Sequence, residues 1–155
     1  MHEEFLRRIR AGADAEALAG LFELDQAGIY RFMLRRLGHR QDAEHATQEL
    51  LRRVLTSLHS LRDPKGYRGW LYRIALRVAQ AQVQSQIGER RRVEAVARTA
   101  PAAGSSMTQT DSPERREQVK TALETLEEDL RTVVLLRYEQ GLSYEEIAEA
   151  TQRPL

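Results

Sequence analysis

The spacing of apolar residues constrains this fold most, because they recur every three or four positions along much of the chain. The spacing runs from Leu18 to Leu37, from Leu50 to Leu58, from Trp70 to Val78 and from Val119 to Leu130. Residues spaced in this way lie on one face of an α-helix, and no stretch alternates convincingly with the period of two that strands require. The 155 residues include only four Pro and nine Gly. The sequence therefore predicts an all-α fold.

A change in composition near residues 93–112 divides the chain. Gly104 to Thr110 is rich in Ser, Thr and Gly, which is typical of a flexible linker. Ser112-Pro113-Glu114 then has the cap, proline and acid that begin many helices. We expect a helical domain at 1–92, a flexible linker at 93–112 and a short helical domain at 113–155.

Charge is divided unevenly between the two parts. Residues 1–92 hold 17 Lys/Arg and 11 Asp/Glu, whereas residues 93–155 hold 7 Lys/Arg and 12 Asp/Glu. The net charge of +1 hides this asymmetry. Almost all the basic residues of the first part are Arg. This indicates a polyanionic partner, because guanidinium groups bind phosphate oxygens and base edges well.

Several classes of protein are excluded by what the sequence lacks. The chain has no Cys, which rules out disulfides, thiolate metal sites and a catalytic Cys. It has no long apolar run and no signal-peptide pattern, so we expect no membrane span and a cytoplasmic location. It shows no nucleophile–base set and no phosphate-binding glycine loop, so we expect neither an enzyme nor a cofactor.

One place in the sequence has the spacing of two metal ligands. His45 and Glu49 stand four residues apart in an acidic, polar stretch. A single His beside carboxylates, with no second His nearby, is a weak signal for a metal ligand set. We therefore expect no metal, and we interpret the stretch as a helix start that faces solvent or a partner.

The C-terminal part carries the opening of a helix-turn-helix. A helix over residues 127–138 should end at Gly141, and Ser143 with Glu146 has the spacing of a capping box on the next helix. Ile147 should then face inward. The same pattern also fits a plain helical hairpin, because capping boxes are common. Since no further helix is present to cover them, we expect Leu142, Ile147 and Ala148 to be poorly covered.

The segment RDPKGYRGWLYRIALR, residues 62–77, combines aromatic and basic residues. Asp63 to Gly66 predicts a turn, and a helix follows. Aromatic rings stack on unpaired bases while Arg side chains hold the phosphate backbone, so the pattern is typical of a site that binds a separated strand. For Trp70 the pattern alone favours a place in the core, whereas Tyr67, Arg68 and Arg73 are better surface candidates.

These pieces together resemble a known family. The stretch from Asp42 to Ala79 resembles region two of extracytoplasmic-function (ECF) sigma factors, and the stretch from Leu123 to Pro154 resembles the first part of their region four. The helix expected around Ala17 to Leu37 also agrees with the pattern of this family. The resemblance implies a factor that binds core RNA polymerase and recognises and melts promoter DNA.

The resemblance also implies roles for particular residues. One helix would dock on the coiled coil of the polymerase β′ subunit, through Asp42, Glu44, Gln48, Glu49, Arg52 and Arg53. The next segment would recognise and melt the minus-ten element, through Arg62, Lys65, Tyr67, Arg68, Trp70, Tyr72, Arg73 and Arg77. The region-four part, with Gly141, Ser143, Glu146 and Ile147, would lie near the β flap. An anti-sigma factor commonly holds such proteins inactive.

Some positions depart from the family pattern. His45 stands where an acid is usual, Arg77 replaces a usual Asn and Ala81 replaces a usual Asp. Residues 80–86 are rich in Gln where the family often has Arg. The family's recognition helix would follow Leu155, so we expect the chain to be a C-terminally truncated fragment of a longer product.

Two other functions stay open on these grounds. A degenerate sigma-like protein could bind polymerase or an anti-sigma factor without initiating transcription, as the Gln-rich stretch suggests. An ordinary helix-turn-helix repressor or activator would bind duplex DNA without polymerase, but it would leave the aromatic and basic segment without a role.

Overall fold

The computed structural model describes residues 1–12, 15–96, 118 and 127–154. Within this part of the chain the regular elements are all helical and no strand occurs, which confirms the all-α prediction. The expected start of a helix at Ser112 and most of the expected linker lie outside the described residues.

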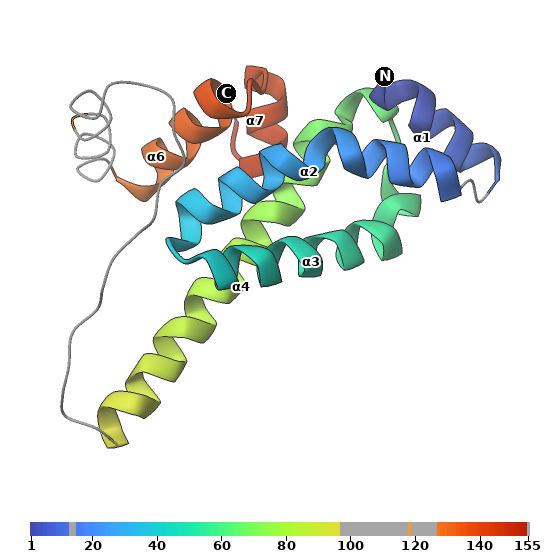
Figure 1. Ribbon diagram of the computed structural model, residues 1–155. Coiled ribbons are helices and arrows are strands. Elements are labelled where there is room, and N and C mark those ends of the chain that lie inside the picture. The colour runs from blue at the N-terminus through green and yellow to red at the C-terminus, as the bar shows by residue number, and fades with distance from the viewer. Residues whose placement is uncertain (13–14, 97–117, 119–126, 155) are drawn as a thin grey trace.

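Helices α1 (His2–Ala11), α2 (Ala15–Leu37), α3 (Arg40–Ser57) and α4 (Tyr67–Val96) pack against one another. Helix α2 ends at Gly38, whose φ of 75° suits a residue without a side chain. Two short 3₁₀ turns, η1 (Leu58–Ser60) and η2 (Pro64–Gly66), join α3 to α4. The end of α4 extends beyond the other helices, and residues 93–96, expected in the linker, are its last turn (Figure 1).

The C-terminal elements are α6 (Glu128–Val134), the π-helical turn η3 (Leu135–Glu139) and α7 (Tyr144–Thr151). We refer to residues 128–152 as the C-terminal hairpin. It lies beside α2 and the first half of α4 (Figure 1), and α7 packs against α4. Gly141, which adopts a φ of 65°, lies in the turn that connects η3 to α7.

One buried cluster includes side chains from both parts of the described chain. From the N-terminal helices it includes Phe32, Met33, Leu50 and Leu71, and from the hairpin it includes Leu136, Leu142, Ile147 and Ala150. Leu142 is 0% exposed and Ile147 is 5% exposed, and Ala148 is half-buried. The expectation that these residues are poorly covered is therefore wrong, because α4 supplies the missing apolar surface. This burial stabilises the hairpin on the helical bundle.

The described helices include none that is long and apolar enough to cross a membrane.

Candidate nucleic-acid interface

The turn that precedes α4 forms as the sequence predicts. The Asp63 carboxylate accepts a hydrogen bond from the Lys65 amide at 3.0 Å, and Pro64 occupies the first position of the turn. Arg62 and Lys65 are exposed on this turn. Their charges are therefore presented to solvent just before the start of α4.

The three aromatic residues of the segment are buried. Tyr67 is 2%, Trp70 4% and Tyr72 3% exposed. The Tyr67 ring lies 5.5 Å from His2 and 6.1 Å from Trp70, and the Tyr72 ring meets Phe32 edge-on at 5.5 Å. The expectation of a surface position for Tyr67 is wrong, because α1 packs a side chain over its ring. The expectation that Trp70 is a core residue is confirmed.

Burial also changes the acidity of the two phenols. Desolvation, together with the nearby Asp25 carboxylate, raises the pKa of Tyr67 far above its ordinary value. Desolvation likewise raises the pKa of Tyr72, although the charge of Arg68 opposes the shift. Both phenols therefore stay neutral and act as hydrogen-bonding core residues in this conformation.

Three arginines, Arg68, Arg73 and Arg77, line the side of α4 that meets α7, and we call them the basic face. The Arg73 guanidinium pairs with the Glu149 carboxylate at 2.6 Å. Arg77 donates to the side-chain oxygen of Gln152 at 2.9 Å. The basic face is thus occupied by the C-terminal hairpin.

Arg68 is held where the hairpin turns. Its guanidinium donates to the backbone oxygens of Gln140 and Gly141, the latter at 3.3 Å, and lies 3.8 Å from Glu146. Beside it, the buried Tyr72 hydroxyl donates to the Gln140 side chain at 2.7 Å. These contacts fix the turn of the hairpin against α4.

The helix start within the hairpin has the capping box that the sequence predicts. The Ser143 hydroxyl accepts from the Glu146 amide at 3.2 Å, and the Ser143 amide donates to the Glu146 carboxylate at 2.7 Å. Gly141 ends the preceding helical turn, and Ile147 faces inward. Gly141, Ser143, Glu146 and Ile147 thus form a turn and the start of the helix that follows it, as expected, in an arrangement that fits both a helix-turn-helix and a plain helical hairpin.

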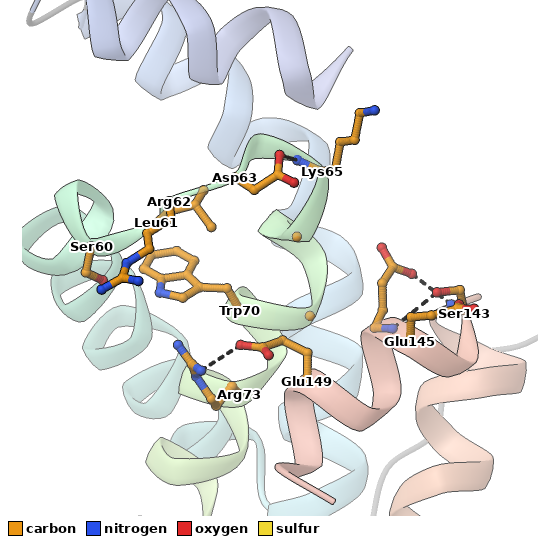
Figure 2. Close-up of a pocket in the computed structure, with 13 residues that line it drawn as sticks. Ser60, Leu61, Arg62, Asp63, Lys65, Trp70, Arg73, Ser143, Glu145 and Glu149 are labelled. Carbon is orange, nitrogen blue, oxygen red and sulfur yellow. Dashed lines mark hydrogen bonds and ion pairs between the residues drawn. The ribbon is translucent and has the colours of Figure 1, made fainter. Parts of the chain in front are cut away.

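An open pocket of about 760 Å³ lies between the η2 turn, α4 and α7. Arg62, Lys65, Trp70, Arg73 and Glu149 are among its lining residues. Figure 2 shows Arg73 and Glu149 pointing toward each other across it from α4 and α7. The pocket therefore brings basic residues of the predicted promoter segment together with acidic residues of the hairpin.

A second set of polar contacts joins the hairpin to α2. Arg36, whose side chain is 8% exposed, pairs with Glu128 at 2.5 Å and donates to the Thr132 hydroxyl at 2.6 Å. Arg35 pairs with Glu139 at 3.1 Å. Burial lowers the pKa of Arg36, and the charge of Glu128 opposes that shift. Basic side chains of the first part thus meet acidic side chains of the second at two places.

Two glycines permit this close approach. A Cβ atom on Gly69 of α4 would lie 2.9 Å from the Glu149 Cβ and 3.0 Å from the Glu146 backbone oxygen. A Cβ atom on Gly28 of α2 would lie 3.0 Å from the Gln140 side-chain oxygen. A side chain at either position would press on the hairpin.

The residues predicted to contact polymerase lie along α3. Glu44, Gln48, Arg52 and Arg53 are exposed, whereas Asp42 is half-buried and accepts from Gln82 of α4 at 3.2 Å. Half-buried Glu49 pairs with Arg53 at 2.7 Å and with Arg52. Hydrogen bonds from these two arginines hold the pKa of Glu49 below its ordinary value. Leu55 lies near this charged set and is 45% exposed, although the apolar spacing from Leu50 to Leu58 predicts an inward-facing position for it.

Sequence reasoning also missed the hairpin residues that occupy the basic face. They are Gln140, Glu149 and Gln152. It missed as well Glu128 and Glu139 of the hairpin, which pair with Arg36 and Arg35 of α2. The excess of acids in residues 93–155 was the available signal, but a charge count does not say which partner those acids meet.

Comparisons with known proteins match the same two segments in the same order. Residues 21–86 match the family described as Sigma-70 region 2, and residues 116–155 match Sigma-70, region 4. The ECF RNA polymerase sigma-E factor of Haemophilus influenzae is 32% identical over 133 residues, which cover 79% of this chain and 70% of that protein. The RNA polymerase sigma-H factor of Pseudomonas aeruginosa is 28% identical over 162 residues, which cover 99% and 83%.

The ECF RNA polymerase sigma-E factor of Escherichia coli is 32% identical over 124 residues, which cover 74% of this chain and 64% of that protein. The predicted family resemblance is therefore confirmed in both segments. The chain belongs to the ECF family of RNA polymerase sigma factors and is a sigma factor for transcription initiation.

Proposed function

We propose that the chain binds core RNA polymerase through the outer side of α3 and recognises and melts promoter DNA through the η2 turn and the start of α4. The observation that carries the DNA-binding part is the gathering of Arg62, Lys65, Arg68, Arg73 and Arg77 on this turn and helix. Guanidinium groups placed in this way bind phosphate oxygens by paired hydrogen bonds.

The polymerase-binding part is supported by the charged pattern of α3. Exposed Gln48 and Arg52 lie on its outer side, and Glu49 holds Arg52 and Arg53 by ion pairs. Such pairs orient long side chains, although each contributes little stability by itself. We propose the coiled coil of the β′ subunit as the partner of this surface, the β flap as a partner of the hairpin, and an anti-sigma factor as a further partner.

Binding to core RNA polymerase tests the first part of the proposal. The purified chain is mixed with core RNA polymerase and followed on a sizing column, with the double reversal Arg52→Glu and Arg53→Glu beside it. Wild type should co-migrate, and the reversal should weaken co-migration because it replaces two positive charges of the contact with two negative ones. Arg7→Glu with Arg92→Glu, which changes charge by the same amount on exposed positions of α1 and α4, is the matched control.

The proposal fails for this chain if folded wild-type protein does not co-migrate with polymerase. Equal weakening by the control pair would mean that overall charge, not the α3 surface, governs binding.

A second candidate, a sigma-like protein that binds polymerase without opening DNA, is favoured by one feature. Residues 80–86 carry four Gln along α4, where family members often have Arg. Polymerase binding without any opening of DNA would select this candidate.

A further inference from the structure

We infer that helix α1 fixes the shape of the loop between α3 and α4, and that Arg10 and His2 are positioning residues for promoter recognition. We call residues 58–66 the α3–α4 loop, which contains η1, η2 and the exposed Arg62 and Lys65. The inference rests on the proposed function in one respect: it assumes that this loop contacts promoter DNA. It adds a role for α1, which carries none of the residues proposed to bind DNA or polymerase.

Arg10 holds the first half of the α3–α4 loop. Its guanidinium extends from the last turn of α1 and donates a hydrogen bond to the backbone oxygen of Leu61. Leu61 lies between the two 3₁₀ turns, and its side chain is 6% exposed. The Leu61 carbonyl and the Arg62 amide belong to one planar peptide unit. Arg10 therefore fixes the direction in which the chain leaves the core toward Arg62.

His2 holds the other end of this loop. Its Nε2 atom is hydrogen-bonded at 3.0 Å to Oδ1 of Asp25, a buried residue of α2. The His2 ring lies 5.5 Å from the ring of Tyr67, the first residue of α4. The Tyr67 amide donates to the Pro64 backbone oxygen and so closes the η2 turn. His2 therefore packs on the residue where the loop enters α4, and Asp25 anchors His2 there.

Helix α1 is firmly attached to the bundle between these two contacts. Leu6 is 1% exposed and belongs to the buried cluster. A Cβ atom on Gly20 of α2 would lie 2.6 Å from the Phe5 ring, so α1 and α2 meet closely there. His2 and Arg10 are separated by about 12 Å along the helix axis, at 1.5 Å per residue. Helix α1 thus contacts both ends of the α3–α4 loop from a fixed place, beside it in Figure 1.

A loop that is held at both ends presents its charges in one geometry. Arg62, Asp63 and Lys65 lie between the two points of attachment and are exposed. Because the loop is already ordered, DNA does not have to order it on binding, which favours affinity. A fixed loop also fits one base sequence better than others, whereas a loose loop adapts to several. We therefore expect α1 to sharpen discrimination between promoter sequences and to have no part in polymerase binding.

The test uses the chain bound to core RNA polymerase and a promoter fragment that this complex selects from a random pool. Opening is measured as permanganate reactivity of thymines, on that fragment and on fragments with single base changes in the opened segment. Arg10→Met removes the donor to Leu61 and keeps much of the side chain's length. Its discrimination between the fragments should fall by roughly three- to tenfold, because a loosened loop pays an ordering cost on binding and tolerates other bases. Arg10→Lys keeps a donor and should recover part of the loss.

A control and a second variant come from the same helix. Arg7→Met makes the same change at an exposed position of α1 and should discriminate as wild type does. His2→Ala removes the contact with Tyr67 at the other end of the loop and should lower discrimination as well. Hydrogen exchange over residues 58–66 should rise in Arg10→Met and His2→Ala but not in Arg7→Met. Co-migration with polymerase should be unchanged in all of these variants.

The outcomes separate this inference from the proposed function. The inference is overturned if Arg10→Met and His2→Ala speed exchange over residues 58–66 but leave discrimination unchanged, while the proposed function stands. It is also overturned if neither substitution changes exchange there, because α1 then does not hold the loop. A parallel fall in polymerase binding and in opening of every fragment would overturn it too, since such a fall reflects folding alone. If the wild-type complex opens no fragment, the proposed DNA-binding function fails and the inference fails with it.

Discussion

Arg73 of α4 and Glu149 of α7 form an ion pair of 2.6 Å across 76 positions of sequence. The pair joins the segment that resembles a promoter-melting element to the segment that resembles a helix-turn-helix. Both side chains are partly exposed, so the pair is expected to be worth about 0.2–1 kcal/mol.

A double-mutant cycle measures this pair. Arg73→Ala and Glu149→Ala should each raise the rate of hydrogen exchange in α7. The double substitution should destabilise α7 by less than the sum of the two single effects. The coupling free energy should be about 0.2–1 kcal/mol at low salt and should fall as salt is added. Additive effects of the two substitutions would mean that the pair does not hold α7.

The apolar contact should contribute more than the ion pair. Leu142 is 0% exposed, and Leu142→Ala is expected to cost about 2–5 kcal/mol because it leaves a cavity under the turn. Tyr138→Ala, at a side chain that is 83% exposed, is the control and should have little effect. The measurement is urea unfolding together with hydrogen exchange of α7, since the hairpin can open locally. Equal effects of the two substitutions would contradict the described packing.

The backbone at Gly141 supplies another prediction. Its φ of 65° is unfavourable for any residue with a side chain, so Gly141→Ala should destabilise the hairpin by about 1 kcal/mol. Gly66→Ala is the matched substitution, because a Cβ there meets nothing within 4 Å and its φ is not positive. Urea unfolding of both variants should show a loss only for Gly141→Ala.

Titration of Glu49 tests the arrangement on α3. Its pKa lies below the ordinary value of 4.5, because Arg52 and Arg53 donate hydrogen bonds to the ionised carboxylate. Because the pKa of Glu49 is lower in the folded chain than in the unfolded chain, these contacts stabilise the fold. Their full contribution is present at pH values above the unfolded-state pKa. That contribution is lost as the pH falls through the folded-state pKa.

The measurement is a carboxyl NMR titration of the folded chain. Arg52→Gln with Arg53→Gln should return the pKa of Glu49 toward 4.5. A titration midpoint that does not move would show that the arginines do not contact Glu49 in solution. Arg7→Gln, at an exposed position of α1, is the control and should leave the midpoint unchanged.

Local structure was well predicted from the sequence, because local signals determine it. The turn with Pro64, the left-handed Gly141 and the reciprocal hydrogen bonds of Ser143 and Glu146 each depend on residues within a few positions of one another. The helical periodicity likewise predicted an all-α fold. These features needed no knowledge of distant contacts.

The docking of the hairpin could not be predicted in the same way. It depends on Gly69 meeting Glu149 and on Tyr72 meeting Gln140, pairs that lie far apart in sequence and follow no period. The same limit applies to Tyr67. The sequence around an aromatic residue between arginines looks the same whether the ring stacks on a base or fills a core. Only the packing of α1 over its ring decides for the core.

Opening of promoter DNA by the complex with polymerase is the most direct test of the proposed function. Promoter fragments are first selected from a random pool by core polymerase with this chain. Reactivity of unpaired thymines to permanganate is then measured. Reactive thymines are expected only when polymerase and chain are both present, and the signal should be lost when Arg68→Glu and Arg73→Glu are combined. Polymerase binding without reactive thymines on any selected fragment would contradict the proposed melting of promoter DNA.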